Sequence, residues 1–192
     1  MGQRPCLQRL HPVRAPAGRA VSLSDRGPPS LRLDLRLRGL QGWDPDALTA
    51  QLTRRDADLG NDDVFVLLLD TYRDRQSAYM FAVNPLGTQA DARVVNDGRT
   101  TDVTWDAEWE ARARIQEWGW SAEMAIPLAS IRYGAGQRRE WGINVGRGRR
   151  RNLELSFWTG PLDAELRVSQ AGTLAGLDLP PPPSRHTGIV TA

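Results

Sequence analysis

The chain has 192 residues, of which 40% are hydrophobic and 25% are charged, a composition typical of one folded globular domain. Its net charge of +2 is unevenly distributed. Residues 1–40 hold eight arginines and two aspartates, whereas residues 41–192 hold 17 arginines and 21 acidic residues. The mildly acidic body argues against nucleic-acid binding. No apolar run is long enough for a transmembrane helix, and prolines and arginines interrupt the N-terminus, so we expect no secretory signal there.

The two ends of the chain differ in composition from its middle. Residues 1–40 are rich in arginine and proline, so we expect a disordered segment or one foreign to the native fold. Within it, LRLDLRLRGL (31–40) alternates leucine with polar residues, the period-two pattern of a strand. A run of prolines predicts a linker or tail over residues 180–192. The folded domain is therefore expected over residues 41–179.

The first half of this domain carries several strand patterns. A strand is predicted around Leu48–Leu52. VFVLLLD (64–70) is a continuous apolar run, which indicates a strand buried on both faces. Residues 77–85 and 88–95 alternate and form a predicted hairpin. Asn, Asp and Gly at 96–98 then predict a turn.

The second half of the domain also carries strand patterns, and further strands are predicted at 109–116, 120–128, 139–147, 154–160 and 168–177. About eight short strands with almost no helix indicate an all-β fold. We expect an antiparallel β-sandwich of the immunoglobulin-like or jelly-roll type.

Tryptophan is concentrated in one stretch: six of the seven indoles lie between Trp105 and Trp158. Trp109, Trp120 and Trp141 are in phase with apolar strand faces and are expected in the core. Trp105 precedes a strand and is expected in a loop, where core packing explains a tryptophan less well. An indole face suits the apolar face of a sugar ring, so an exposed tryptophan here would indicate a carbohydrate platform.

The arginine-rich GRGRRR (146–151) follows a predicted strand. It is interpreted as a solvated hairpin loop, although such a tract is also found in RNA-binding segments. Its arginines form the only basic run of the folded part of the sequence.

An ordered string of segments carries a resemblance to a known family. The segments are 52–63, 64–91, 105–133, 141–160 and 171–177. Together they resemble the family 9 carbohydrate-binding modules. More closely, they resemble the N-terminal module of large bacterial outer-membrane proteins, in which this sandwich precedes a predicted β-barrel. Residues 1–40 depart from the family pattern, and the chain is similar to a fragment of such a protein.

The resemblance implies a non-catalytic module that binds polysaccharide or oligosaccharide. It also implies an association with glycoside hydrolases of the xylanase type, and polysaccharide breakdown or uptake at the cell envelope. The location would be extracytoplasmic, in the periplasm or outer membrane, with attachment to a β-barrel in the longer protein. Related modules often carry structural calcium, and Asn61, Asp62 and Asp63 offer oxygen ligands. His11 and His186 both lie in the predicted tails, which argues against a catalytic triad.

The expected carbohydrate site combines stacking indoles with hydrogen-bonding side chains. Its predicted members are Trp105, Trp158, Trp43, Asn84, Asp106 and Arg149. The alternative is a structural or interaction sandwich of an outer-membrane barrel protein without sugar binding. Exposed indoles favour the first interpretation, and buried indoles favour the second.

Overall fold

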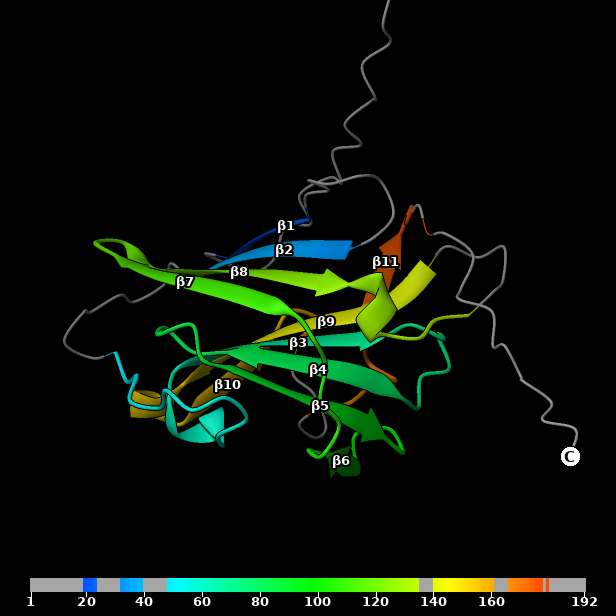
Figure 1. The fold of residues 1–192 in the computed structure, drawn as a ribbon, viewed down its shortest axis with the longest axis horizontal. Coiled ribbons are helices and arrows are strands. Elements are labelled where there is room, and N and C mark those ends of the chain that lie inside the picture. Colours follow the sequence, from blue (N-terminus) through cyan, green and yellow to red (C-terminus); the bar gives the residue numbers. More distant parts are fainter. Residues whose placement is uncertain are drawn as a thin grey trace, which may run out of the picture.

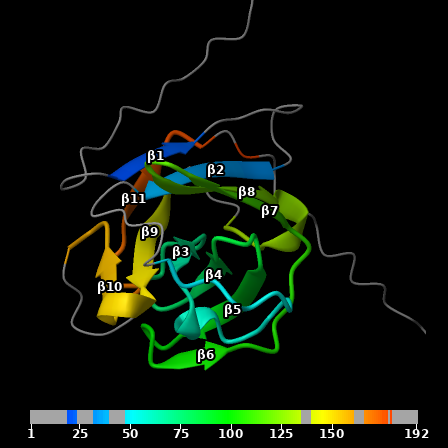
Figure 2. The same ribbon diagram turned by 90° about the vertical axis from the view of Figure 1, so that its left-hand side faces the viewer.

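The computed structural model describes residues 19–23, 32–39, 48–134, 140–160, 166–177 and 179. These residues form two antiparallel sheets that stack as a β-sandwich (Figures 1 and 2). The predicted all-β fold class is thus confirmed. Within the described ranges, no helix has the length and apolarity needed to cross a membrane. Trp43 and the predicted tail at 180–192 lie outside the described residues.

Sheet A is the upper layer in Figure 1. Its four strands are, in spatial order, β1 (Arg19–Leu23), β2 (Arg32–Gly39), β8 (Gly119–Pro127) and β7 (Glu110–Gln116). The strand predicted over 31–40 is confirmed as β2. β1 was not expected, because residues 1–40 were predicted to be disordered or foreign to the native fold, with a strand pattern only at 31–40. Disorder does not hold for 19–23, since this segment pairs with β2 from Arg19↔Gly39 to Leu23↔Leu35.

Sheet B has seven strands, and β9 is its longest. In spatial order they are β10 (Glu154–Phe157), β9 (Glu140–Arg149), β3 (Val64–Asp70), β4 (Ala78–Val83), β5 (Gln89–Val95) and β6 (Thr100–Asp102); β11 (Gly172–Ala175) also pairs with β9. β6 was not predicted, because its sequence Thr-Thr-Asp lacks the apolar residues that indicate a strand.

The strand predicted around Leu48–Leu52 is absent. Its backbone finds a side-chain partner instead of a neighbouring strand. The N–H groups of Gln51 and Leu52 donate to the carboxylate of Asp62, at distances between 2.9 and 3.1 Å. Buried backbone donors need a partner, and a carboxylate satisfies them as well as a sheet does.

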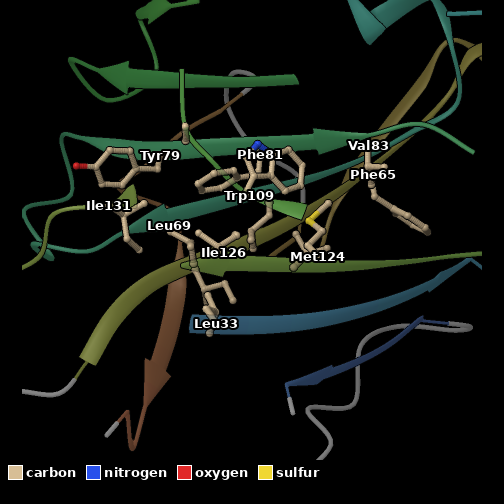
Figure 3. Close-up of a cluster of buried hydrophobic side chains, with 14 of the residues drawn as sticks. Leu33, Phe65, Leu69, Tyr79, Phe81, Val83, Trp109, Met124, Ile126 and Ile131 are labelled. Carbon is tan, nitrogen blue, oxygen red and sulfur yellow. The ribbon is translucent and has the colours of Figure 1, made fainter. Parts of the chain in front are cut away.

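The core lies between the two sheets (Figure 3). Alternation sends every second side chain of β3 and β4 inward, including Leu69, Phe81 and Val83. From sheet A, Met124 and Ile126 of β8 belong to the same core cluster, and both are at most 1% exposed. This packing holds the sheets together by removing their apolar faces from water.

Two segments cover the outer face of sheet B. Leu52, Ala57 and Leu59, which precede β3, pack against Val64, Val66 and Ala82. Leu166 and Val168 pack in a second cluster with Leu68, Ala78 and Val94. Every residue of β3 is consequently buried, as the continuous apolar run predicted.

Candidate functional site

Trp105 lies in the loop between β6 and β7, and its indole is partly buried. The ring centroid is 4.8 Å from that of Tyr79, with an interplanar angle of 39°. It is also 6.0 Å from Phe81 in an edge-on arrangement. Sheet B thus supports the indole through Tyr79 and Phe81, and Trp105 as a residue stays partly exposed.

A buried carboxylate fixes the loop that carries Trp105. Asp91 of β5 accepts hydrogen bonds from the Ala107 N–H (3.0 Å), the Trp109 indole N–H (2.8 Å) and the Arg55 guanidinium (2.7 Å). Burial raises the pKa of Asp91, and these three donors oppose that rise. A carboxylate with its oxygens so occupied holds loop, strand and Arg55 in one geometry. Trp105 is therefore held in a pre-organised position.

Asp106 follows Trp105 directly and is exposed. Its carboxylate lies 3.0 Å from the guanidinium nitrogen of Arg55 that also bonds Asp91. Asp106 is the one hydrogen-bonding residue predicted for the site that the structure places beside Trp105. The Asp106 side chain is 73% exposed, so its carboxylate reaches solvent beside the loop that carries Trp105.

The strand register adds two charged residues that sequence reasoning did not place in the site. Tyr79 of β4 pairs with Arg93 of β5, and Arg93 pairs with Asp102 of β6. Register partners point to the same face with Cβ atoms about 5 Å apart. Arg93, which is exposed, therefore lies beside Tyr79, on whose ring Trp105 rests, and exposed Asp102 lies one strand further along the same face.

Hydrogen bonds from Thr104 favour the ionised form of Asp102. It accepts hydrogen bonds from the hydroxyl (2.6 Å) and the N–H (3.0 Å) of Thr104. These bonds, aided by the charge of Arg93, lower the pKa of Asp102. The Trp105 surface thus combines an aromatic ring with a cation and an anion that both reach solvent.

Trp158 lies elsewhere. Its backbone N–H donates to the Val145 carbonyl at 2.8 Å, which places it beyond β9. Its six-membered ring lies over Gly172, where an added Cβ would come within 2.4 Å of Cζ3. β3 and β9 separate it from β4, so about three strand spacings, roughly 14 Å, divide the two indoles. The structure does not bring Trp105 and Trp158 together.

Asn84 and Arg149 are also remote from Trp105. Asn84 is fully buried just past the end of β4 opposite Tyr79. Its amide donates to the Leu52 carbonyl (2.7 Å) and to Asp62 (2.8 Å), so it ties the segment before β3 to the sheet. Arg149 ends β9, with its guanidinium 3.8 Å from the Glu154 carboxylate.

The remaining tryptophans follow expectation. Trp109, Trp120 and Trp141 are buried at 6%, 0% and 2% exposure, which confirms that they belong to the core. Trp118 lies at the β7–β8 turn and is 36% exposed. Only the loop tryptophans of the described residues are therefore open to a ligand.

In the described part of the chain, no three His, Cys, Asp or Glu side chains gather in a way that could hold a metal ion. Asp62 accepts hydrogen bonds from Gln51, Leu52 and Asn84. Asp63 accepts from the Arg150 N–H at 2.8 Å, and burial raises its pKa. Both carboxylates thus serve as acceptors that fasten loops to sheet B.

Comparison with known proteins identifies the fold. No protein-family model and no curated protein sequence matches the chain. A solved structure from Bacteroides uniformis ATCC 8492, of a protein proposed to bind carbohydrate, is similar with a TM-score of 0.61 and 13% identity, over 82% of this chain and 77% of that one. A family 9 carbohydrate-binding module from Caldicellulosiruptor kristjanssonii, in complex with cellotriose, is similar with a TM-score of 0.57 and 10% identity, over 88% and 82% of the two chains. The chain has the fold of these modules, as the resemblance predicted.

Proposed function

We propose that this domain is a non-catalytic carbohydrate-binding module that holds a polysaccharide or oligosaccharide against Trp105. The observation that carries the proposal is the partly exposed indole, braced by Tyr79 and fixed through Asp91. The fold shared with a module that binds cellotriose supports it. No step of the proposal requires bond cleavage by the domain itself.

The chemistry suits a sugar. Its C–H face packs on the indole, a contact worth about 1 kcal/mol beyond the buried area. Arg93 offers several N–H donors and Asp102 offers acceptor oxygens, and vicinal hydroxyls present both functions. Asp106 supplies a further acceptor at the edge of the loop. Trp105 thus provides contact area, and the charged pair provides orientation.

The wider setting is proposed on the sequence resemblance alone. The domain would belong to a longer extracytoplasmic protein at the periplasm or outer membrane, joined to a β-barrel. There it would keep polysaccharide near an uptake or glycoside hydrolase system. This setting predicts plant-type glycans such as xylan and cello-oligosaccharides as ligands.

Binding of xylo- and cello-oligosaccharides, measured by calorimetry, tests the proposal. Trp105→Ala should weaken affinity at least about tenfold, because it removes the stacking surface. Trp118→Ala is the matched control, since Trp118 is a tryptophan exposed at the β7–β8 turn of sheet A, outside the predicted site. It should bind as the parent does. Arg93→Gln, which keeps the indole, should cost about three- to tenfold.

Equal affinity of Trp105→Ala and the parent would reject the site. A folded parent chain that binds no glycan would favour the second candidate, a structural or interaction sandwich. That candidate is favoured by the burial of Trp109, Trp120 and Trp141 and by the structural use of Asn84. Melting curves of each variant separate lost binding from lost folding.

A further inference from the structure

We propose that the β9–β10 connection docks this protein on a bilayer surface that carries anionic phospholipid headgroups. The connection (150–153) with the adjoining strand ends, residues 149–155 in all, is named here the basic–aliphatic loop. It contains three arginines, one glutamate and two exposed leucines. In both ribbon views it forms an outer corner of the molecule (Figures 1 and 2).

The loop is anchored from below. Arg150 begins a 3-10 turn, η4 (Arg150–Asn152), and its N–H donates to the buried carboxylate of Asp63 at 2.8 Å. The Leu153 N–H closes the turn on the Arg150 carbonyl at 3.1 Å. The loop therefore presents a defined surface to an approaching partner.

Its aliphatic side chains face water. Leu153 is 77% exposed, the largest exposure among the large hydrophobic residues of the described chain, and Leu155 is 37% exposed. Leu153 also has φ of 51°, in the left-handed region that residues with a Cβ adopt uncommonly. Glycine or asparagine would suit this position at lower strain. An exposed leucine at a strained backbone position contributes favourable free energy only when an apolar partner buries its side chain.

The charges around Leu153 indicate what kind of partner would bury it. Arg150 and Arg151 are exposed beside Leu153. The single acid of the loop, Glu154, has its carboxylate within 3.8 Å of Arg149. The loop thus carries a net charge of +2 on a body that is otherwise acidic. Basic side chains that flank an exposed aliphatic residue match an interface of anionic headgroups and acyl chains.

The same side chains favour a bilayer over nucleic acid. Single-stranded RNA or DNA is held by aromatic stacking platforms along a basic groove, and residues 149–155 contain no aromatic residue. Leucine gains from burial in acyl chains and gains nothing from a phosphate backbone. An exposed leucine at the centre of the basic run is therefore the deciding feature.

Docking through this loop leaves the Trp105 surface uncovered. Gly148 pairs with Val64 at the first residue of β3, whereas Tyr79 pairs with Leu69 near its other end. Five residues of extended strand span about 17 Å. The two surfaces are therefore separate, and this inference does not rest on sugar binding.

Co-flotation of the full chain with vesicles tests the proposal. One set contains about 30 mol% phosphatidylglycerol in phosphatidylcholine, and the other contains phosphatidylcholine alone. We expect binding only to the anionic set, weakened as NaCl rises from about 0.1 M to about 0.5 M. Arg150→Gln combined with Arg151→Gln should lower binding about tenfold. Arg112→Gln with Arg114→Gln, two exposed arginines of β7, is the control of equal charge and should bind within about twofold of the parent.

Leu153→Gly isolates the aliphatic contribution, because glycine accepts the left-handed backbone and keeps every charge. It should lower vesicle binding about fivefold without lowering the melting temperature. Undiminished binding of Leu153→Gly would overturn the bilayer assignment, and so would equal losses in the two double arginine variants. Binding of a homopolymeric RNA as tightly as the anionic vesicles would overturn it in favour of nucleic acid.

Discussion

The two sheets of the sandwich share one core but treat their outer faces differently. The outer face of sheet B is covered over its centre by the segment before β3 and by the segment at 166–171, so β3 is buried on both sides and β4 nearly so. The outer face of sheet A carries exposed Arg112, Arg114 and Glu123. A continuous apolar run in β3 and strict alternation in β7 record this difference in the sequence.

Both candidate surfaces belong to the covered sheet. Trp105 rests on β4, and the basic–aliphatic loop joins β9 to β10. Loops that Asp91 or Asp63 fastens to sheet B, whose central strand β3 is buried throughout, can hold a ligand surface in a fixed geometry. The arrangement separates a rigid frame from the side chains that it displays.

The largest test of this comparison replaces one outward-facing side chain on each sheet. Leu68→Ala, on the covered face of β3, should lower the free energy of unfolding by about 2–5 kcal/mol, because Leu68 is 1% exposed and leaves a cavity. Arg114→Ala, on the open face of β7, should change it by less than about 0.5 kcal/mol. Urea unfolding followed by tryptophan fluorescence measures both. Similar small changes would show that the covering segments leave sheet B effectively open.

A second test loosens the cover itself. Asn84→Ala removes the donor to Asp62 and to the Leu52 carbonyl, and it also removes the acceptor for the N–H groups of Leu86 and Thr88. Groups left buried without partners should cost about 2–3 kcal/mol.

Hydrogen exchange measures the loosening directly. The N–H groups of Gln51 and Leu52 should exchange faster in Asn84→Ala than in the parent. Asn61→Ala, at an exposed position of the same segment, should leave both rates and stability nearly unchanged. Protection that survives in Asn84→Ala would mean that apolar packing alone holds the segment in place.

Sequence patterns predicted the frame well because burial leaves a periodic trace. The faces of β4, with Tyr79 and Phe81 inward and Met80 outward, follow from alternation. The core positions of Trp109, Trp120 and Trp141 follow from phase. Leu48–Leu52 shows the limit: Leu48 packs against the core between the sheets and Leu52 against the outer face of sheet B, but the carboxylate of Asp62 takes the place of a neighbouring strand.

The candidate site was less accessible to such reasoning. Arg93 and Asp102 join Tyr79 only through the register of three strands, a long-range property that composition and periodicity do not encode. An asparagine placed after a strand looks exposed, yet the segment before β3 covers Asn84. Composition places Trp105 and Trp158 in one tryptophan-rich stretch, but it does not show the strands that separate them in space.

The smallest expected effect concerns the second covering segment, which Asp97 ties to the β5–β6 turn. Its carboxylate accepts from the Ser169 N–H (2.7 Å), the Ser169 hydroxyl (2.9 Å) and the Arg167 guanidinium (2.7 Å). Burial opposes ionisation, but these bonds outweigh it and lower the pKa of Asp97 below the ordinary 3.8.

A carboxyl whose pKa is lower in the folded state adds stability above its unfolded pKa and loses it as pH falls through the folded value. Asp97→Asn should therefore cost about 1 kcal/mol at neutral pH, an amount discounted for solvent screening, and less near pH 3. Urea unfolding of parent and variant at both pH values measures the difference. A cost that stayed constant or grew in acid would show that the Asp97 charge contributes nothing. The cover over Val168 would then be held by its apolar contacts alone, as the core between the sheets is.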